Sequence, residues 1–67
     1  MSDIITLQLT ADEAEIVRDA LETDLEGYED AARDARADGA RADVTAFEEA
    51  ANRIRQVMQK VAAALSD

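Results

Sequence analysis

The chain of 67 residues contains no cysteine, histidine, proline or tryptophan, and each absence excludes a class of stabilisation or chemistry. Without cysteine there is neither a disulfide nor a thiolate metal site. Without histidine the chain lacks the commonest metal ligand and the usual acid and base of nucleophilic catalysis. Serine occurs only at positions 2 and 66, where nothing is available to activate it. We therefore expect a protein that is not an enzyme and that carries no cofactor.

Long apolar runs are also absent, and positive charge is scarce. No run approaches the roughly 20 residues that span a bilayer. The first residues, Met1, Ser2 and Asp3, lack a basic region and an apolar core, so we expect no signal peptide and a cytoplasmic protein. The net charge of −9 argues against a nucleic-acid partner and against an anionic membrane surface. All of the excess negative charge lies in residues 1–38.

Alternation of residue types near the start of the chain predicts a short β-strand over residues 4–9. Ile5, Leu7 and Leu9 alternate with Ile4, Thr6 and Gln8, which is the period of a strand. No second strand is predicted elsewhere in the chain. Because a lone strand leaves its backbone N–H and C=O groups unpaired, we expect it to pair with the same strand of a second copy.

Two helices follow, and both begin at a predicted capping box. Thr10 and Glu13 predict the start of a helix over 11–38, and Gly39 is the expected left-handed C-cap. Residues 39–43 form the predicted turn, with Thr45 and Glu48 as the second capping box of a helix over 44–65. Such a short connection makes the helices antiparallel. Residues 1–67 are expected to form a single domain.

The predicted helical hairpin is too small and too rich in alanine to enclose a core alone. Chains below roughly 70–80 residues usually need a disulfide, a metal or a partner subunit. The fold class we predict is mainly α, an antiparallel helical hairpin with a short N-terminal β-strand. Two or more copies are expected to form a homo-oligomer, most simply a dimeric four-helix bundle with strands paired between subunits. The predicted oligomer interface consists of Ile5, Leu7, Leu9, Val17, Leu21, Leu25, Ile54, Val57 and Val61.

Acidic residues recur at helical spacing on the side of the first helix opposite its apolar positions. A regular row of carboxylates speeds association with a basic surface. We therefore expect a non-catalytic protein-interaction module, such as an inhibitor, an antitoxin or a nucleic-acid mimic, that docks on a basic protein partner. The predicted partner-binding residues, called the acidic stripe below, are Asp19, Glu22, Glu26, Glu29 and Asp30.

No metal site is predicted, although residues 22–27 resemble the start of a calcium loop. An EF-hand needs a bidentate Glu at its twelfth position, where this chain has Arg33. Glu26, Glu29 and Asp30 are also no predicted magnesium site. Glu26 and Glu29 lie on the polar face of the helix, whereas such a site gathers carboxylates inside a bundle.

Three other interpretations of the sequence stay open. Arg33, Arg36 and Arg41 near the turn are compatible with an oligomer that binds a small molecule or a nucleotide. The acidity is also compatible with a high-salt habitat, in which case it says nothing about a partner.

The third interpretation starts from residues 4–10, which precede a capped helix. This segment resembles the entry to the ribbon-helix-helix family of DNA-binding repressors, whose N-terminal strands pair and enter the major groove. The resemblance implies a strand-paired dimer and a DNA-binding regulator. The first helix is far longer than that of the family, and Thr6 and Gln8 stand where the family has Arg or Lys.

Overall fold

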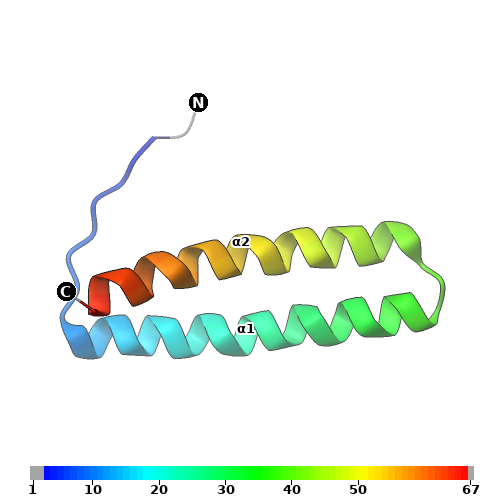
Figure 1. The fold of residues 1–67 in the computed structure, drawn as a ribbon, viewed down its shortest axis with the longest axis horizontal. Coiled ribbons are helices and arrows are strands. Elements are labelled where there is room, and N and C mark those ends of the chain that lie inside the picture. The colour runs from blue at the N-terminus through cyan, green and yellow to red at the C-terminus, as the bar shows by residue number, and fades with distance from the viewer. Residues whose placement is uncertain (1–2, 67) are drawn as a thin grey trace.

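A computed structural model describes residues 3–66 as two long antiparallel helices joined by a tight turn (Figure 1). Helix α1 runs over Ala11–Ala37 and helix α2 over Arg41–Leu65. The mainly α class and the helical hairpin are thereby confirmed. The molecule measures 43 × 29 × 14 Å, and its shortest dimension is little more than the diameter of one helix. The hairpin is therefore a single layer with two broad faces.

Helix α1 begins where the sequence predicts. The Glu13 N–H donates to the Thr10 hydroxyl at 3.1 Å, and the Thr10 N–H donates to the Glu13 carboxylate at 2.9 Å. This reciprocal pair satisfies two backbone donors that a helix start otherwise leaves without partners. Helix α1 then continues without a break through Gly27.

The turn between the helices is set by Gly39, which has a positive φ of 74°. The Ala40 N–H donates to the Ala35 carbonyl at 2.9 Å, and the Gly39 N–H donates to the Arg36 carbonyl at 3.2 Å. This is the Schellman arrangement, in which glycine adopts the left-handed conformation without steric cost. Helix α1 ends at Ala37, one residue before the predicted end.

Helix α2 begins at Arg41, three residues earlier than predicted. Its N-cap is Ala40, which offers no side-chain acceptor. The predicted capping box at Thr45 does not form, because Thr45 already lies in the helix and its hydroxyl donates to the Arg41 carbonyl at 3.2 Å. Glu48, the other half of the predicted box, reaches across to Arg36 of α1 instead. The turn therefore occupies only residues 38–40.

Small side chains line the contact between α1 and α2. Within residues 3–66, the buried residues are all alanines, namely Ala14, Ala32, Ala35 and Ala51. Near the turn, the rings of Tyr28 and Phe47 pack together with centroids 6.3 Å apart at an interplanar angle of 42°. Such a tilted aromatic pair adds about 0.5–1.5 kcal/mol beyond the area that it buries. The larger aliphatic side chains of both helices are only half-buried or exposed.

Residues 3–10, called the N-terminal arm below, differ from the prediction. They form no strand, and none of residues 3–66 does. The arm leaves the start of α1 and passes the C-terminal end of α2 into solvent (Figure 1), so that Ile5 and Leu7 are largely exposed. The physical reason is that a strand needs a neighbour for its backbone hydrogen bonds, and the described part of a single chain supplies none.

Candidate functional site

The two broad faces of the hairpin have different chemistry because the helices are antiparallel. In a helix with 3.6 residues per turn, the residues before and after a buried position lie on opposite flanks. After the buried Ala32 and Ala51 come Arg33 and Asn52, whereas Ala31 and Ala50 precede them. Because the two helices are antiparallel, the residue that follows a buried position in α1 and the residue that follows a buried position in α2 lie on the same face of the hairpin. One face is therefore polar and the other is rich in alanine.

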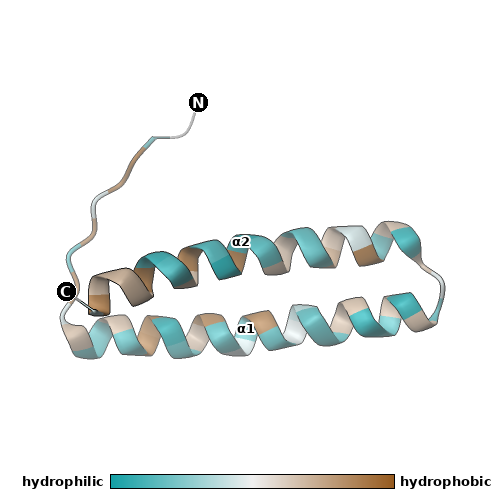
Figure 2. Ribbon diagram, viewed as in Figure 1, coloured by the Kyte–Doolittle hydropathy of each residue, from teal (hydrophilic) through white to brown (hydrophobic). Residues whose placement is uncertain are grey.

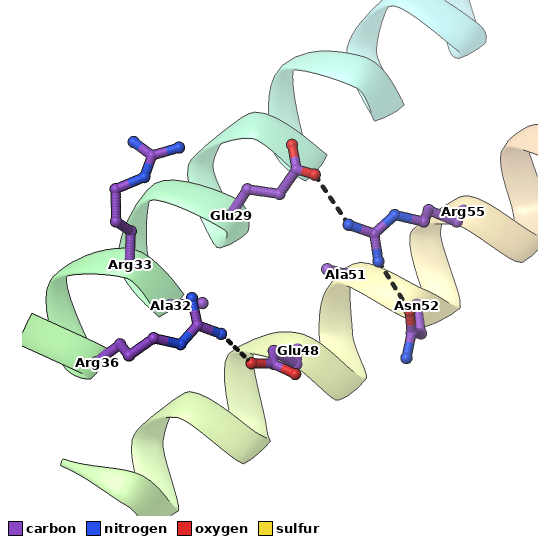
Figure 3. Close-up of a pocket in the computed structure, with 8 residues that line it drawn as sticks. All are labelled: Glu29, Ala32, Arg33, Arg36, Glu48, Ala51, Asn52 and Arg55. Atoms are coloured by element: carbon purple, nitrogen blue, oxygen red, sulfur yellow. Dashed lines mark hydrogen bonds and ion pairs between the residues drawn. The ribbon is translucent and has the colours of Figure 1, made fainter. Parts of the chain in front are cut away.

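The polar face contains a shallow groove of about 320 Å³ between the helices, called the charged groove below (Figure 3). Arg55 of α2 donates to the Glu29 carboxylate of α1 at 2.8 Å and to the Asn52 side-chain oxygen at 2.8 Å. Two turns closer to the loop, Arg36 of α1 is paired with Glu48 of α2. In one pair α1 supplies the acid and α2 the base, and in the other pair these roles are reversed. Both pairs form in the same alignment of α1 with α2.

The ion pairs of the charged groove contribute specificity more than stability. The side chains of Glu29 and Arg55 are 43% and 45% exposed, and pairs of this kind are each worth about 0–1 kcal/mol. Their geometry nevertheless fixes how α1 and α2 align, because the small alanine side chains between the helices interlock weakly. The ion pairs of the charged groove thus serve to align α1 with α2 along their length.

The arginines near the turn do not converge on an empty site. Arg33 is directed away from α2 (Figure 3) and pairs with Asp30 at 3.0 Å. Arg36 is paired with Glu48, and Arg41 does not line the groove. The alternative of a nucleotide site at Arg33, Arg36 and Arg41 stays a prediction without a specific observation in its favour.

The structure divides the acidic stripe into two parts. Glu29 and Asp30 are held in ion pairs by Arg55 and Arg33. The remaining three residues of the stripe are exposed and form no ion pair within residues 3–66. The sequence did not reveal this division, because the pairing of Glu29 with Arg55 depends on the register between two helices. The exposed part of the stripe without an ion pair in residues 3–66 consists of Asp19, Glu22 and Glu26.

The face opposite the charged groove is called the apolar face below, and it exposes side chains that are usually buried. Ile16 is 68% exposed and Val57 is 44% exposed. Gly27 also lies on this face, and a Cβ added there would meet no atom within 4 Å, which leaves room for a neighbouring helix. The apolar face consists of Ile16, Val17, Ala20, Leu21, Gly27, Ala31, Ala46, Ala50, Val57, Val61 and Ala64.

The open end of the hairpin adds a second apolar surface that the N-terminal arm helps to build. Hydrophobic ribbon in Figure 2 occupies both the arm and the last turns of α2. A groove of about 910 Å³ lies there, lined by Leu7 and Leu9 from the arm and by Val57, Val61 and Leu65 from α2. Because Val57 and Val61 belong to the apolar face as well, the two surfaces are continuous.

The nine predicted interface residues occupy three environments. Ile5, Leu7 and Leu9 of the arm are exposed, as is Val57 on the apolar face. The other five are half-buried beside the contact between α1 and α2, namely Val17, Leu21, Leu25, Ile54 and Val61. A single hairpin thus leaves part of every one of these side chains accessible, and their role in an oligomer stays a prediction.

Ionisable and metal-binding chemistry is sparse in the described part of the chain. No group of three or more acidic residues within residues 3–66 is arranged to hold a metal ion. The pKa of Glu13 is lowered from its usual value because the Thr10 N–H and then the Thr10 hydroxyl hydrogen-bond to its carboxylate. Neither described helix has a stretch long and apolar enough for a bilayer crossing.

Comparisons with known proteins add no relative to these observations. No protein-family model, no curated protein and no solved structure matches the chain.

Proposed function

We propose that this protein is a non-catalytic, cytoplasmic interaction module that assembles with itself through the apolar face and the arm and binds a basic protein through its acidic stripe. The observation that carries the proposal is the separation of these surfaces. Carboxylates without an ion pair in the described chain lie on one flank of α1, and exposed aliphatic side chains lie on the other. One surface can therefore be occupied while the other stays available.

The surface area of the chain supports self-association. The protein exposes 5527 Å², whereas a compact monomer of 7.3 kDa exposes about 4,200 Å². The excess is roughly 1,300 Å², and each partner of a standard protein interface buries about 800 Å². The area that each copy would bury in a standard dimer interface is therefore smaller than the excess area that this chain exposes. Pairing of residues 4–9 between copies would satisfy the arm's backbone groups and complete the predicted strand.

The acidic stripe supports a basic partner. Asp19, Glu22 and Glu26 follow one another at intervals of three and four residues along one side of α1. No cation of the described chain neutralises them, so their field extends into solvent over about one Debye length, which is roughly 8 Å at physiological salt. A complementary basic groove would be steered toward this flank. An inhibitor, an antitoxin or a nucleic-acid mimic would use such a surface.

A pair of charge-reversed variants tests the acidic stripe. Immobilised wild-type protein would be compared with Glu22→Lys/Glu26→Lys for the proteins that each retains from an extract of the source cells. Asp34→Lys/Glu49→Lys is the matched control, because both residues are exposed, lie outside the stripe and change the net charge by the same amount. The proposal expects a defined basic protein on the wild type and the control and its loss from the stripe variant. The proposal is contradicted if all three proteins retain the basic protein equally, or if the wild type retains none.

The solution mass tests self-association. Native mass spectrometry or light scattering is expected to give a dimer or a larger species of the 7.3 kDa chain at both low and high salt. A folded monomer at all accessible concentrations would refute this half of the proposal. A chain that is unfolded at low salt but folded in molar salt would indicate that its acidity reflects a high-salt habitat.

A further inference from the structure

We propose that two hairpins stack through their apolar faces around a twofold axis parallel to the helices, so that Asp24 of one copy lies opposite Arg53 of the other. This arrangement rests on the self-association proposed above and specifies its geometry. It places both turns at one end of the assembly and both N-terminal arms at the other.

Lys60 lines the apolar groove at the open end, and two further charges lie near the middle of the hairpin. Asp24 lines the apolar surface of α1 together with Ile16 and Ala20. On α2, Arg53 comes two positions after the buried Ala51, so helical spacing puts it about 200° from the contact with α1, at the outer edge of the apolar face. Neither Asp24 nor Arg53 forms an ion pair with another residue in the range 3–66. Each is the middle residue of its helix, Asp24 in Ala11–Ala37 and Arg53 in Arg41–Leu65. Both charges therefore lie near the midpoint of the hairpin's length.

Two twofold axes can bring the apolar faces of a single-layer hairpin together. An axis that lies in the layer and crosses the helices stacks α1 on α1 and α2 on α2. Because Asp24 and Arg53 are at the midpoints, that axis places Asp24 against Asp24 and Arg53 against Arg53. Like charges at close range on a partly dehydrated surface oppose such a dimer.

An axis parallel to the helices stacks α1 of one copy on α2 of the other and keeps the ends aligned. The midpoint charges then meet as Asp24 with Arg53, twice in the dimer. In both arrangements every helix is antiparallel to both of its neighbours, as in the common up-down bundles, so helix direction does not distinguish the two axes. The two midpoint charges therefore favour this second arrangement.

The N-terminal arms favour the same axis independently. With the parallel axis, the two arms leave the assembly at one end, where residues 4–9 of both copies can pair as strands beside the apolar grooves of Val57 and Val61. With the crossing axis, the arms lie at opposite ends of a molecule 43 Å long and cannot meet.

Neutralising one charge of each kind distinguishes the two axes. With the parallel axis, Asp24→Asn and Arg53→Gln each remove an attraction, so each is expected to raise the dimer dissociation constant by roughly three- to tenfold. With the crossing axis, each substitution removes a repulsion and lowers the dissociation constant. Asp19→Asn is the matched control, since it removes the same charge from the opposite flank of α1. Sedimentation equilibrium at a fixed salt concentration measures all four proteins.

Charge exchange gives a second readout. Asp24→Arg alone is expected to weaken the dimer further, and Asp24→Arg/Arg53→Asp is expected to restore the wild-type dissociation constant. If the double variant is as weak as Asp24→Arg, the two charges do not meet across the interface and the arrangement is overturned.

Distances between spin labels test the geometry directly, because the chain has no native cysteine to interfere. Ala37→Cys places a label on an exposed site near the turn, and Ala63→Cys places one near the open end, both outside the apolar face. The parallel axis predicts distances between copies of roughly 20–30 Å at both sites, from helix spacings of 8–10 Å. The crossing axis predicts distances close to the 43 Å length of the hairpin. A dimer with the long distances overturns the arrangement alone, whereas a monomer refutes the self-association as well.

Discussion

At the scale of single residues, alanine determines how closely the two helices approach. Ala51 is 3% exposed and Ala32 is 5% exposed, and both lie beside the charged groove where the ion pairs cross between α1 and α2. A larger side chain at either position has no space without a shift of the helix axes. The methyl groups therefore set the distance over which Arg55 and Arg36 reach their carboxylates.

Enlarging one of these alanines should destabilise the hairpin. Ala51→Leu is expected to lower the free energy of unfolding by about 1–3 kcal/mol, because overpacking forces the helices apart and strains the pairs across them. Ala63→Leu, at an exposed site of the same helix, is the control and should change stability by less than about 0.5 kcal/mol. Urea denaturation monitored by circular dichroism measures both. Equal effects of the two variants would show that α1 and α2 are not in close contact at Ala51.

Glu13 gives the cap of α1 a defined pH dependence. The pKa of its carboxyl is lowered in the folded chain, so the charged form contributes stability above the usual pKa of 4.5. That contribution is lost as the pH falls through the lowered value. Glu13→Gln keeps an acceptor for the Thr10 N–H but does not titrate, so the difference in melting temperature between it and the wild type should shrink in acid.

The control for this titration is Glu15→Gln, which removes the same charge one turn into α1 without touching the cap. Melting curves from pH 7 to pH 2 would be recorded for the three proteins. If the Glu15→Gln and Glu13→Gln curves diverge from the wild type in the same way, the capping box is not the cause.

At the scale of helices, the boundaries show which local signals could be predicted. The sequence predicted the start of α1 and the role of Gly39, because a capping box and a left-handed glycine act within a few residues. It misplaced the start of α2. Thr45 and Glu48 have the spacing of a capping box, but the chain re-enters a helix immediately after Gly39, and Glu48 has a stronger partner in Arg36.

The candidate surfaces were predictable to different degrees for the same reason. The row of acids on α1 follows from helical periodicity alone. Which of those acids are neutralised does not, because the pairs of Glu29 with Arg55 and of Arg36 with Glu48 connect residues far apart in the chain. In the arm, a local pattern was not sufficient. The alternation of Ile5, Leu7 and Leu9 leads to a strand only where a second strand is present to pair with it.

The N-cap of α2 is a site where the helix can be strengthened. Ala40 has no side-chain acceptor for the first N–H groups of α2. Ala40→Ser supplies one and is expected to raise the free energy of unfolding by about 1 kcal/mol. Thermal denaturation of Ala40→Ser beside Ala42→Ser, in which the same residue lies inside the helix, measures the effect of position. A gain in both variants, or in neither, would contradict the assignment of Ala40 as the cap.

At the scale of the whole molecule, the charge of −9 acts in opposite directions on the two proposed surfaces. Two copies repel each other through their net charge, whereas a basic partner is attracted by it. Salt screens both effects, with a Debye length of about 30 Å at 0.01 M and 10 Å at 0.1 M.

Added salt should therefore strengthen self-association and weaken capture of a basic partner. Between about 0.01 M and 0.1 M salt, the dimer dissociation constant is expected to fall. Over the same range the dissociation constant for a lysine-rich model peptide should rise. Sedimentation equilibrium and fluorescence anisotropy measure the two constants. A rise of both constants would mean that attractions across the dimer interface, such as that of Asp24 with Arg53, outweigh the repulsion between the net charges.

The three-residue turn also has a consequence for the order of events in assembly. Helical hairpins whose contacts join neighbouring segments have low contact order and fold within microseconds to milliseconds. The charged groove and the turn would thus be complete long before two copies meet at ordinary concentrations. The proposed dimer would then form by an encounter between finished hairpins, so the rate of dimer formation should grow with the square of the protein concentration, while the rate of helix formation should not depend on concentration.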